Sequence, residues 1–257
     1  MDQPTSPTSP KFIRWLPYWA VFQTDLRQTL QSWIYRLWVV VTVMAAVGYL
    51  LYRVGVHREA GIIQSATILT GDLLRGMLLG SISLIIVLTV SSIASERGTL
   101  ADSVLSRGIS RYQYFLAKWH ARLVVVLMTF GVLGVSVLVS SSFMLNEDIS
   151  WSGCVVGLIS VGAILFAITS WGVTIGALCN STVMGITILW LVLYGTGFVF
   201  SMLPAPFPSP DRTLSLLPQV LRGQYDTGLI VQLVLVSMVL SGIAVVAGLY
   251  AFAKKDV

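Results

Sequence analysis

The stretch GCVVGLISVGAILFAITSWGVTIGAL, residues 153–178, decides the class of this chain because it contains no charged residue. A helix over this stretch would be about 39 Å long at about 1.5 Å per residue, and the hydrocarbon core of a bilayer is about 30 Å thick. A membrane barrel would instead need alternating strands of about ten residues, and no such alternation is visible. The stretch therefore predicts a transmembrane helix.

Five further apolar stretches share this character. They are Trp33–Tyr52, Leu73–Ala94, Trp119–Leu145, Val183–Leu203 and Leu229–Phe252. Over all 257 residues, 56% are hydrophobic and only 11% are charged, whereas soluble domains carry about 25% charged residues. This composition excludes a soluble globular enzyme and a disordered chain. The sequence predicts an all-α integral membrane protein with six transmembrane helices, which form one domain over residues 33–257.

The segment before the first predicted span differs from the spans. Residues 1–11 are rich in Pro, Ser and Thr and are expected to form a flexible tail, and they lack the pattern of a signal peptide. Residues 12–32 place apolar residues at helical spacing with polar residues between them, which predicts an amphipathic helix lying at the membrane interface. The alternative is an irregular start of the first span. The residues that we assign to the interfacial helix are Trp19, Asp25, Leu26, Arg27 and Leu30.

The distribution of basic residues predicts the orientation in the membrane. The chain has 16 Lys and Arg, 11 Asp and Glu, and a net charge of +5. If the N-terminus is inside, eleven of the basic residues fall on the inside and five on the outside. Cytoplasmic segments carry the excess of Lys and Arg, so we expect both termini in the cytoplasm. In a membrane protein such a charge excess indicates orientation before it indicates nucleic-acid binding.

Several kinds of chemistry are absent from the sequence. No GxxxxGK[ST] motif occurs, so we expect no ATP site on this chain. His57 and His120 fall on opposite sides of the predicted membrane, and Cys154 and Cys179 flank one span too far apart to bridge, so we expect no metal site. No acidic residue lies in the middle of a span, which makes a proton-coupled carrier less favoured.

Two smaller patterns have more than one interpretation. Asp72 and Arg75 lie at the outer start of the second span, where they can serve the helix end, snorkel to the interface or contact a substrate. Three GxxxG spacings can allow helices to approach closely, within the chain or between two chains. They are Gly76–Gly80, Gly153–Gly157 and Gly172–Gly176.

The loop after the second span contains a short predicted helix. Residues 95–123 read SERGTLADSVLSRGISRYQYFLAKWHARL, in which Thr99 and Asp102 have the form of a capping box and Gly108 can end a helix. We therefore expect a helix over 99–107 beneath the membrane. Glu96 precedes it, either as a solvated loop charge or as a docking residue at the head of this helix.

This loop resembles the E-x-G-T-L…LLS-x-P-[IV]-S-R…K segment of type-2 ABC transporter permeases, and in particular the subgroup containing the permease of the nitrous-oxide-reductase maturation transporter. The matching residues are Glu96-Arg97-Gly98-Thr99-Leu100, Leu105-Ser106, Ile109-Ser110-Arg111 and Lys118. The pattern F-x-x-(D/E)-L-R-x-x-L-x-S from Phe22 to Ser32 and the ending FAKKDV resemble the same family. Gly108 stands where many relatives have proline.

The resemblance implies a type V exporter-like permease in the bacterial plasma membrane. It implies no catalysis on this chain, because ATP and Mg²⁺ would bind to two copies of a separate ATPase subunit. A second permease chain, identical or paralogous, would complete the path through the lipid bilayer, and no nucleic acid is involved. The residues implied to couple to the ATPase are Glu96, Arg97, Gly98, Thr99, Leu100, Val104, Leu105, Arg107 and Gly108.

The outer loop, residues 204–228, is the remaining segment with a distinctive sequence pattern. Prolines at alternate positions from Pro204 to Pro210 favour an extended run, and residues 215–222 are expected to form a short amphipathic helix ending at Gly223. Leu214, Leu217 and Leu221 would share one face and rest on the outer leaflet or the span ends as an outer gate. An ordinary exposed loop is the alternative.

Two other functions remain open at this stage. One is a secondary carrier or channel without ATP, which would need an ionisable or broken-helix site inside the membrane. The other is an ATPase-driven mechanotransmitter that acts on an extracytoplasmic partner protein, which would dock on the outer loop.

Overall fold

The computed structural model describes residues 15–60, 65–94, 109–145, 149–202 and 210–254, and its regular structure there is entirely helical. The predicted tail (1–11), the helix expected over 99–107 and most of the proline run lie outside these residues. The helices are α1 (Leu16–Gln31), α2 (Trp33–Ala60), α3 (Ala66–Ala94), α5 (Arg111–Leu145), α6 (Trp151–Leu178), α7 (Thr182–Met202), α8 (Pro210–Ser215), α9 (Leu217–Leu221) and α10 (Thr227–Lys254).

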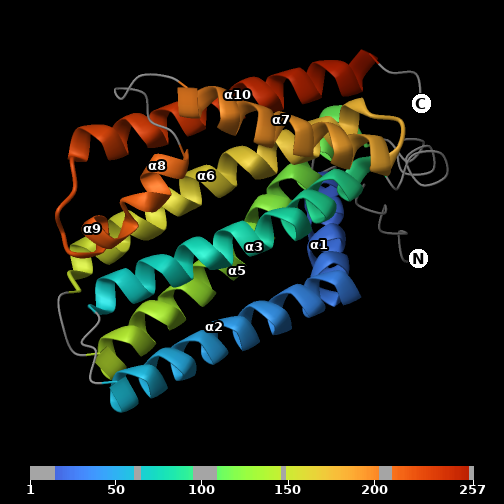
Figure 1. Ribbon diagram of the computed structural model, residues 1–257. Helices are drawn as coiled ribbons and strands as arrows, with labels where there is room; N and C mark the ends of the chain where they lie inside the picture. Colours follow the sequence, from blue (N-terminus) through green and yellow to red (C-terminus); the bar gives the residue numbers. More distant parts are fainter. Residues whose placement is uncertain (1–14, 61–64, 95–108, 146–148, 203–209, 255–257) are drawn as a thin grey trace, which may run out of the picture.

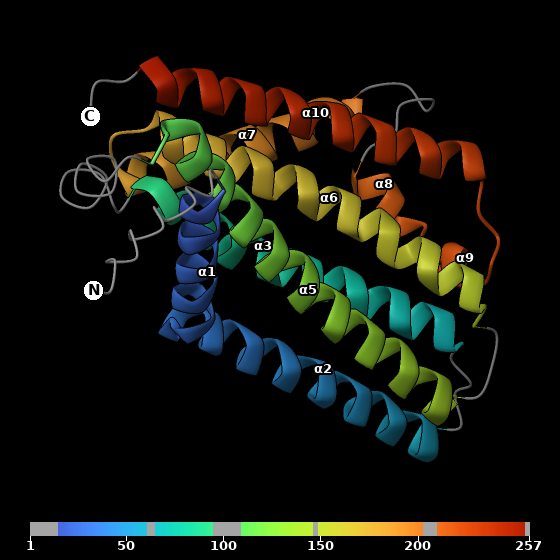
Figure 2. The same ribbon diagram turned by 180° about the vertical axis from the view of Figure 1, so that it is seen from behind.

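The six long helices α2, α3, α5, α6, α7 and α10 run side by side and alternate in direction along the chain (Figures 1 and 2). The short helix α1 crosses one end of this bundle, which we call the α1 end, and α9 lies at the opposite end, which we call the α9 end (Figure 1). The last residue of α3, the first of α5 and the C-terminus of α10 all lie at the α1 end.

Among the described residues, five helices are long and apolar enough to cross a membrane, namely α2, α3, α5, α6 and α10. The chain is therefore a multi-pass membrane protein, as the composition predicts. Helix α7 contains a shorter apolar segment, Thr182–Gly197, which is not long enough for a full span. A sixth crossing therefore stays a prediction.

Close packing around α6 explains two of the three GxxxG spacings. A Cβ atom on Gly176 would collide with the carbonyl oxygen of Val90 in α3, and one on Gly172 would collide with the side chain of Thr89. A Cβ atom on Gly153 would likewise collide with α9, and one on Gly157 would make ordinary contact with the side chains of α9, whereas Gly76 and Gly80 have open space above them. The chain therefore uses two of these spacings to pack its own helices, as small residues do in membrane proteins.

Helix α5 is longer than a span requires. Its 35 residues correspond to about 52 Å, compared with about 30 Å of hydrocarbon. It begins at Arg111, before the apolar stretch that starts at Trp119, because Ser110 and Gln113 cap it reciprocally. The backbone N–H of Gln113 donates to Oγ of Ser110 at 3.2 Å, and the backbone N–H of Ser110 donates to Oε1 of Gln113 at 3.3 Å. Within α5, no charged residue follows Arg122, so residues 123–145 can fill the hydrocarbon core. The first three turns of α5, about 18 Å, then extend beyond the hydrocarbon at the α1 end.

Candidate functional site

Helix α1 presents three different faces. One face packs against α5 and carries the half-buried Tyr18 and Leu26 together with the buried Asp25 and Thr29. A second face is apolar but exposed, as expected for a helix at a membrane interface. It consists of Trp15, Leu16, Trp19 and Leu30, and Trp33 continues it at the start of α2. The third face is polar, so the predicted amphipathic helix is present with an additional face that packs on the bundle.

The buried face of α1 contains an ion cluster with α5. Oδ1 of Asp25 accepts hydrogen bonds from Nζ of Lys118 at 3.2 Å and from Nη2 of Arg122 at 3.1 Å. All three residues are buried, with exposed fractions of 3%, 2% and 9% in that order. Lys118 and Arg122 are four residues apart and therefore lie on one side of α5. The cluster holds the middle of α1 at the polar base of α5.

The cluster also includes the end of α3. Nζ of Lys118 donates a second hydrogen bond of 2.9 Å to the backbone carbonyl of Ser92, which lies two residues before the end of α3. Within the described part of the chain, Oδ2 of Asp25 has no hydrogen-bond partner. The Lys118 ammonium group on α5 therefore connects α1 and α3 at the α1 end.

A second polar contact joins α1 to α5 beside the cluster. The hydroxyl of Tyr18 lies 3.0 Å from Nδ1 of His120, which is also 2.9 Å from the carbonyl oxygen of Leu116. Burial raises the pKa of the Tyr18 phenol above its ordinary value, so this hydroxyl keeps its proton at neutral pH. The His120 ring packs on Trp119, with 4.5 Å between the ring centroids.

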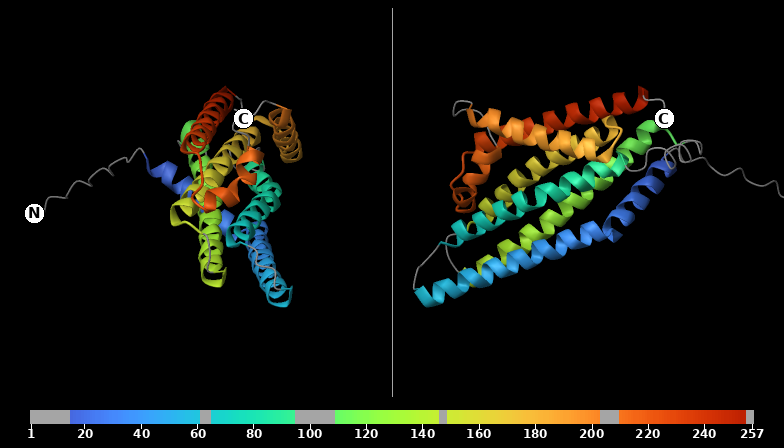
Figure 3. Two further views of the ribbon diagram at one scale, coloured as in Figure 1. Left: turned by 60° about the vertical axis from the view of Figure 1, so that its left-hand side comes forward. Right: turned by 45° about the vertical axis from the view of Figure 1, so that its right-hand side comes forward.

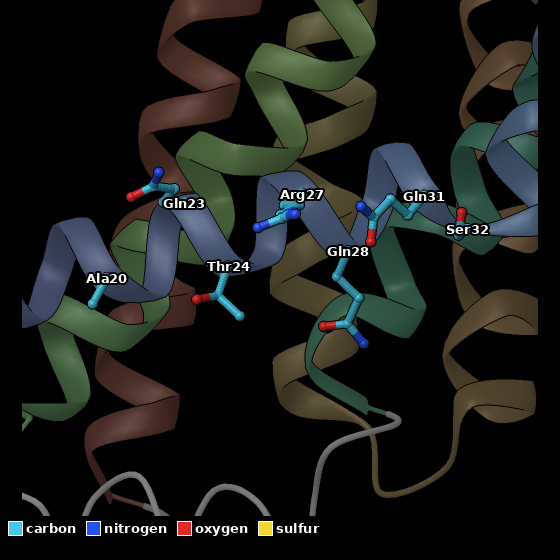
Figure 4. A pocket seen from close by; sticks show the side chains of 7 residues that line it. All are labelled: Ala20, Gln23, Thr24, Arg27, Gln28, Gln31 and Ser32. Atoms are coloured by element: carbon cyan, nitrogen blue, oxygen red, sulfur yellow. The ribbon is translucent and has the colours of Figure 1, made fainter.

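The polar face of α1 lines an open groove of about 750 Å³ (Figure 4). Its described lining residues are Ala20, Gln23, Thr24, Arg27, Gln28, Gln31 and Ser32. The side chains of Thr24 and Gln28 project from α1 into the open space (Figure 4). Amide, hydroxyl and guanidinium groups suit contact with a polar protein surface. No group of metal-ligating side chains occurs in the part of the chain that was described.

The outer leucines are buried more deeply than predicted. Leu214, Leu217 and Leu221 are 5%, 0% and 0% exposed, and they join the main core with residues such as Leu74 and Leu165. Of the two surfaces expected for them, the outer leaflet and the span ends, the leucines lie against the span ends. Helices α8 and α9 pack against α3 and α6 at the α9 end (Figure 3).

The single helix expected over 215–222 is also replaced by two shorter ones. Helix α8 ends at Ser215 and α9 begins at Leu217, with Pro218 in its first turn. Proline lacks a backbone N–H and cannot continue a preceding helix, so a new helix starts at this point. Leu214 therefore belongs to α8, and Leu217 and Leu221 belong to α9.

Glycines and hydrogen bonds hold α9 in place. A Cβ atom on Gly153 would collide with the carbonyl oxygen of Val220, and one on Gly71 would lie 2.8 Å from the Pro218 ring. The backbone N–H of Ser150 donates to the carbonyl of Leu221 at 2.9 Å. Gly223, with φ of 83°, ends α9 in the left-handed conformation that glycine adopts most easily.

Arg222 connects the end of α9 to the start of α3. Its Nε donates to Oγ1 of Thr67 at 2.9 Å, and its Nη2 donates to Oγ of Ser65 at 3.0 Å. The α9 end is therefore tied to α3 by side-chain hydrogen bonds and to the start of α6 by a backbone hydrogen bond.

The predicted site residues fall into three groups. The residues expected to couple to an ATPase all lie outside the described residues: Glu96, Arg97, Gly98, Thr99, Leu100, Val104, Leu105, Arg107 and Gly108. The interfacial residues lie on α1, where Trp19 and Leu30 are exposed and Arg27 faces the groove. Leu26 is half-buried and Asp25 is buried. The outer leucines lie together inside the bundle.

Lys118 and Arg122 were not predicted as partners of Asp25. The signal that could have identified them is a pair of cations four residues apart on an otherwise apolar helix, together with a single acidic residue on the preceding amphipathic helix. The sequence shows both features, but it does not show that α1 crosses α5 at this point.

No family model matches this chain, and no curated protein shows significant similarity to it. The function must therefore be argued from the sequence motifs and the geometry described above.

Proposed function

We propose that this chain is the membrane-spanning permease subunit of an ATP-binding cassette transporter and exports a substrate. The observation that carries this proposal is the buried cluster of Asp25, Lys118 and Arg122. It connects an interfacial helix to a spanning helix at the end of the bundle where the residues resembling the ABC permease motif are attached. A force applied to α1 or to the segment 95–108 would reach α3 and α5 directly.

In this proposal the chain transmits movement and performs no chemistry of its own. ATP and Mg²⁺ bind to two copies of a separate ATPase subunit, whose closure pushes on residues 95–108 and on the polar groove of α1. The polar base of α5 extends about 18 Å beyond the hydrocarbon and acts as the stalk that carries this movement into the membrane. Two permease chains, each with α7 as its fifth of six crossings, form the path.

The position of the buried charges favours this function over a secondary carrier. Among the described residues, the buried charged side chains are Asp25, Lys118 and Arg122, and all three lie at the α1 end. A carrier driven by protons usually places an ionisable group at membrane depth. The described part of the bundle interior contains Ser and Thr hydroxyls instead, such as Thr169 and Ser241.

The α1 end is proposed to face the cytoplasm of a bacterial cell, because the basic residues concentrate there. Single cysteines in place of Gln28 at the α1 end and Gln224 at the α9 end are expected to label oppositely, since both positions are exposed. In a background with Cys154 and Cys179 replaced by Ser, an impermeant maleimide added to intact spheroplasts should modify the Gln224→Cys variant only. Modification of the Gln28→Cys variant from outside would contradict the orientation.

The experiment that tests the proposed function is copurification with an ATPase. The wild-type chain, solubilised mildly from its native membrane, is expected to bring with it a chain that carries Walker A and ABC signature motifs and hydrolyses ATP. Replacing Leu100 and Val104 together with Asp is expected to abolish this association, because an unpaired charge buried in an interface costs about 3–5 kcal/mol.

The matched control is Ser106→Asp, which adds a charge on the other side of the helix expected over 99–107. It should leave the association intact, and membrane insertion should be unchanged in both variants because neither alters a span. If no ATPase accompanies the wild-type chain, the proposed function is wrong. If the Leu100/Val104 variant retains the ATPase, the docking role of this segment is wrong.

A further inference from the structure

We infer that Asp25 is a positioning residue that holds α1 in register on α5, and that loss and renewal of its contacts with Lys118 and Arg122 accompany each movement of α1. The first part concerns the chain alone. The second part, the link to an ATP-driven cycle, rests on the proposed function.

The ionic contacts of α1 with α5 meet at one atom, beside the contact of 3.0 Å between the Tyr18 hydroxyl and Nδ1 of His120. Oδ1 of Asp25 accepts from both Lys118 and Arg122, on successive turns of α5. Lys118 extends the connection to the carbonyl of Ser92 on α3. A small displacement of α1 along α5 would therefore lengthen two charge-assisted hydrogen bonds at once, while an apolar contact of similar size would change little.

The join between α1 and α2 leaves α1 free to act as one rigid unit. Only Ser32 separates the two helices, and its backbone is extended, with φ of −64° and ψ of 142°. Oγ of Ser32 accepts from the backbone N–H of Tyr35 at 3.2 Å, so α2 has its own cap whatever direction α1 takes. Helix α1 leaves α2 at a sharp angle (Figures 1 and 2). Its position must then be fixed by what it contacts on α5.

The other residues on this face of α1 specify the register less sharply. Leu26 is only half-buried, and the hydroxyl of Thr29 is used within α1, where it donates to the carbonyl of Asp25 at 2.7 Å. Buried ion clusters contribute little net stability compared with apolar residues of the same volume, and their best-attested use is to define a register or a switch. The α1–α5 cluster fits that use.

The register is tested on the chain alone by spin labels on cysteines at Gln28 of α1 and Tyr112 of α5, both of which are exposed. The wild-type background is expected to give one dominant distance between the labels. Asp25→Asn and Asp25→Lys should broaden this distance or shift it. The exchange Asp25→Lys with Lys118→Asp should restore a single distance, because it rebuilds one ion pair between α1 and α5 with the two signs exchanged, and Arg122 then lies beside the carboxylate at position 118. Unchanged distances in both single variants would overturn the inference.

The control is Asp226→Asn at the α9 end, which makes the same chemical change at an exposed position. Oδ1 of Asp226 accepts from the backbone N–H of Gly228 at 2.8 Å, and an Asn side chain can accept the same bond. The distance between the α1 and α5 labels should be unaffected. A change in this variant equal to that of Asp25→Asn would also overturn the inference.

The second part is tested with a variant that keeps the packing but has no charges: Asp25→Leu, Lys118→Met and Arg122→Met together. This variant is expected to fold and to bind the ATPase. It should lose the change in distance between the α1 and α5 labels that treatment with ATP and vanadate produces in the wild-type complex. Retention of the full change would overturn the role in the cycle. If the wild-type chain binds no ATPase, the proposed function fails, while the distances in the chain alone still decide the register.

Discussion

Replacing Gly153 with valine is expected to expel α9 from its place against α6 and to destabilise the whole chain. The carbonyl oxygens of Val220 and Leu221 approach Gly153 so closely that even a single Cβ atom cannot be accommodated without moving the backbone of α9. Overpacking usually costs about 1–3 kcal/mol, and a collision with backbone atoms, which cannot rotate away, belongs at the upper end of this range.

The measurement uses the neighbouring Cys154, which is buried and has a free thiol. In a background with Cys179→Ser, the Cys154 thiol should react with a maleimide much faster in the Gly153→Val variant than in the chain that keeps Gly153. The melting temperature of this variant in detergent should also fall. Gly162→Val is the matched control on the same helix, because a Cβ atom there meets nothing within 4 Å. Similar reactivity in both variants would show that α9 does not occupy this position.

Changing Leu217 and Leu221 together to Ser is expected to have the second large effect. Both side chains are fully buried in the main core, so the loss includes their transfer free energy and the cavities left behind. Truncation of one buried leucine typically costs about 2–5 kcal/mol, and the two changes together should cost about 4–10 kcal/mol of unfolding free energy. Denaturation in mixed micelles should show this loss.

The functional consequence of this double change separates three roles of the segment. If α9 closes the exit of the proposed transporter, variants that remain folded should hydrolyse ATP and yet leak small solutes from reconstituted vesicles. If the segment only docks an outer protein, that partner should be lost without leakage. Leu229→Ser, at an exposed position of the same end, should change neither. Wild-type stability and permeability in the double variant would support an ordinary loop.

The sequence predicts the spans and α1 because both depend on local patterns. Continuous apolar runs mark helices that lie in lipid, and the spacing of Trp19, Leu26 and Leu30 marks an amphipathic helix. Helix ends depend on caps rather than on apolar runs, and α5 begins at the cap formed by Ser110 and Gln113, ahead of the apolar run that starts at Trp119. Helical spacing also grouped Leu214, Leu217 and Leu221 correctly on one side of the outer segment.

What covers those leucines could not be predicted, because it depends on contacts between distant parts of the chain. Pro218 packs on Gly71, and Asp25 pairs with Lys118 across 93 positions of sequence. A glycine gives no sign of which neighbour it accommodates. A lone carboxylate on an amphipathic helix looks like a solvated charge until the crossing helix is known.

The packing of α9 against α3 and α6 has a consequence for biosynthesis. A chain emerging from the ribosome releases α3 and α6 before Pro218 and Leu221, so the space that these residues fill is vacant until the segment after α7 has been synthesised. Apolar surface between the two earlier helices is then exposed to lipid or to an insertase until the outer segment arrives. Helices α8 and α9 are thus the last elements to pack between α3 and α6. Quality control that recognises the unfilled space between these helices would distinguish a finished chain from one stalled after α7.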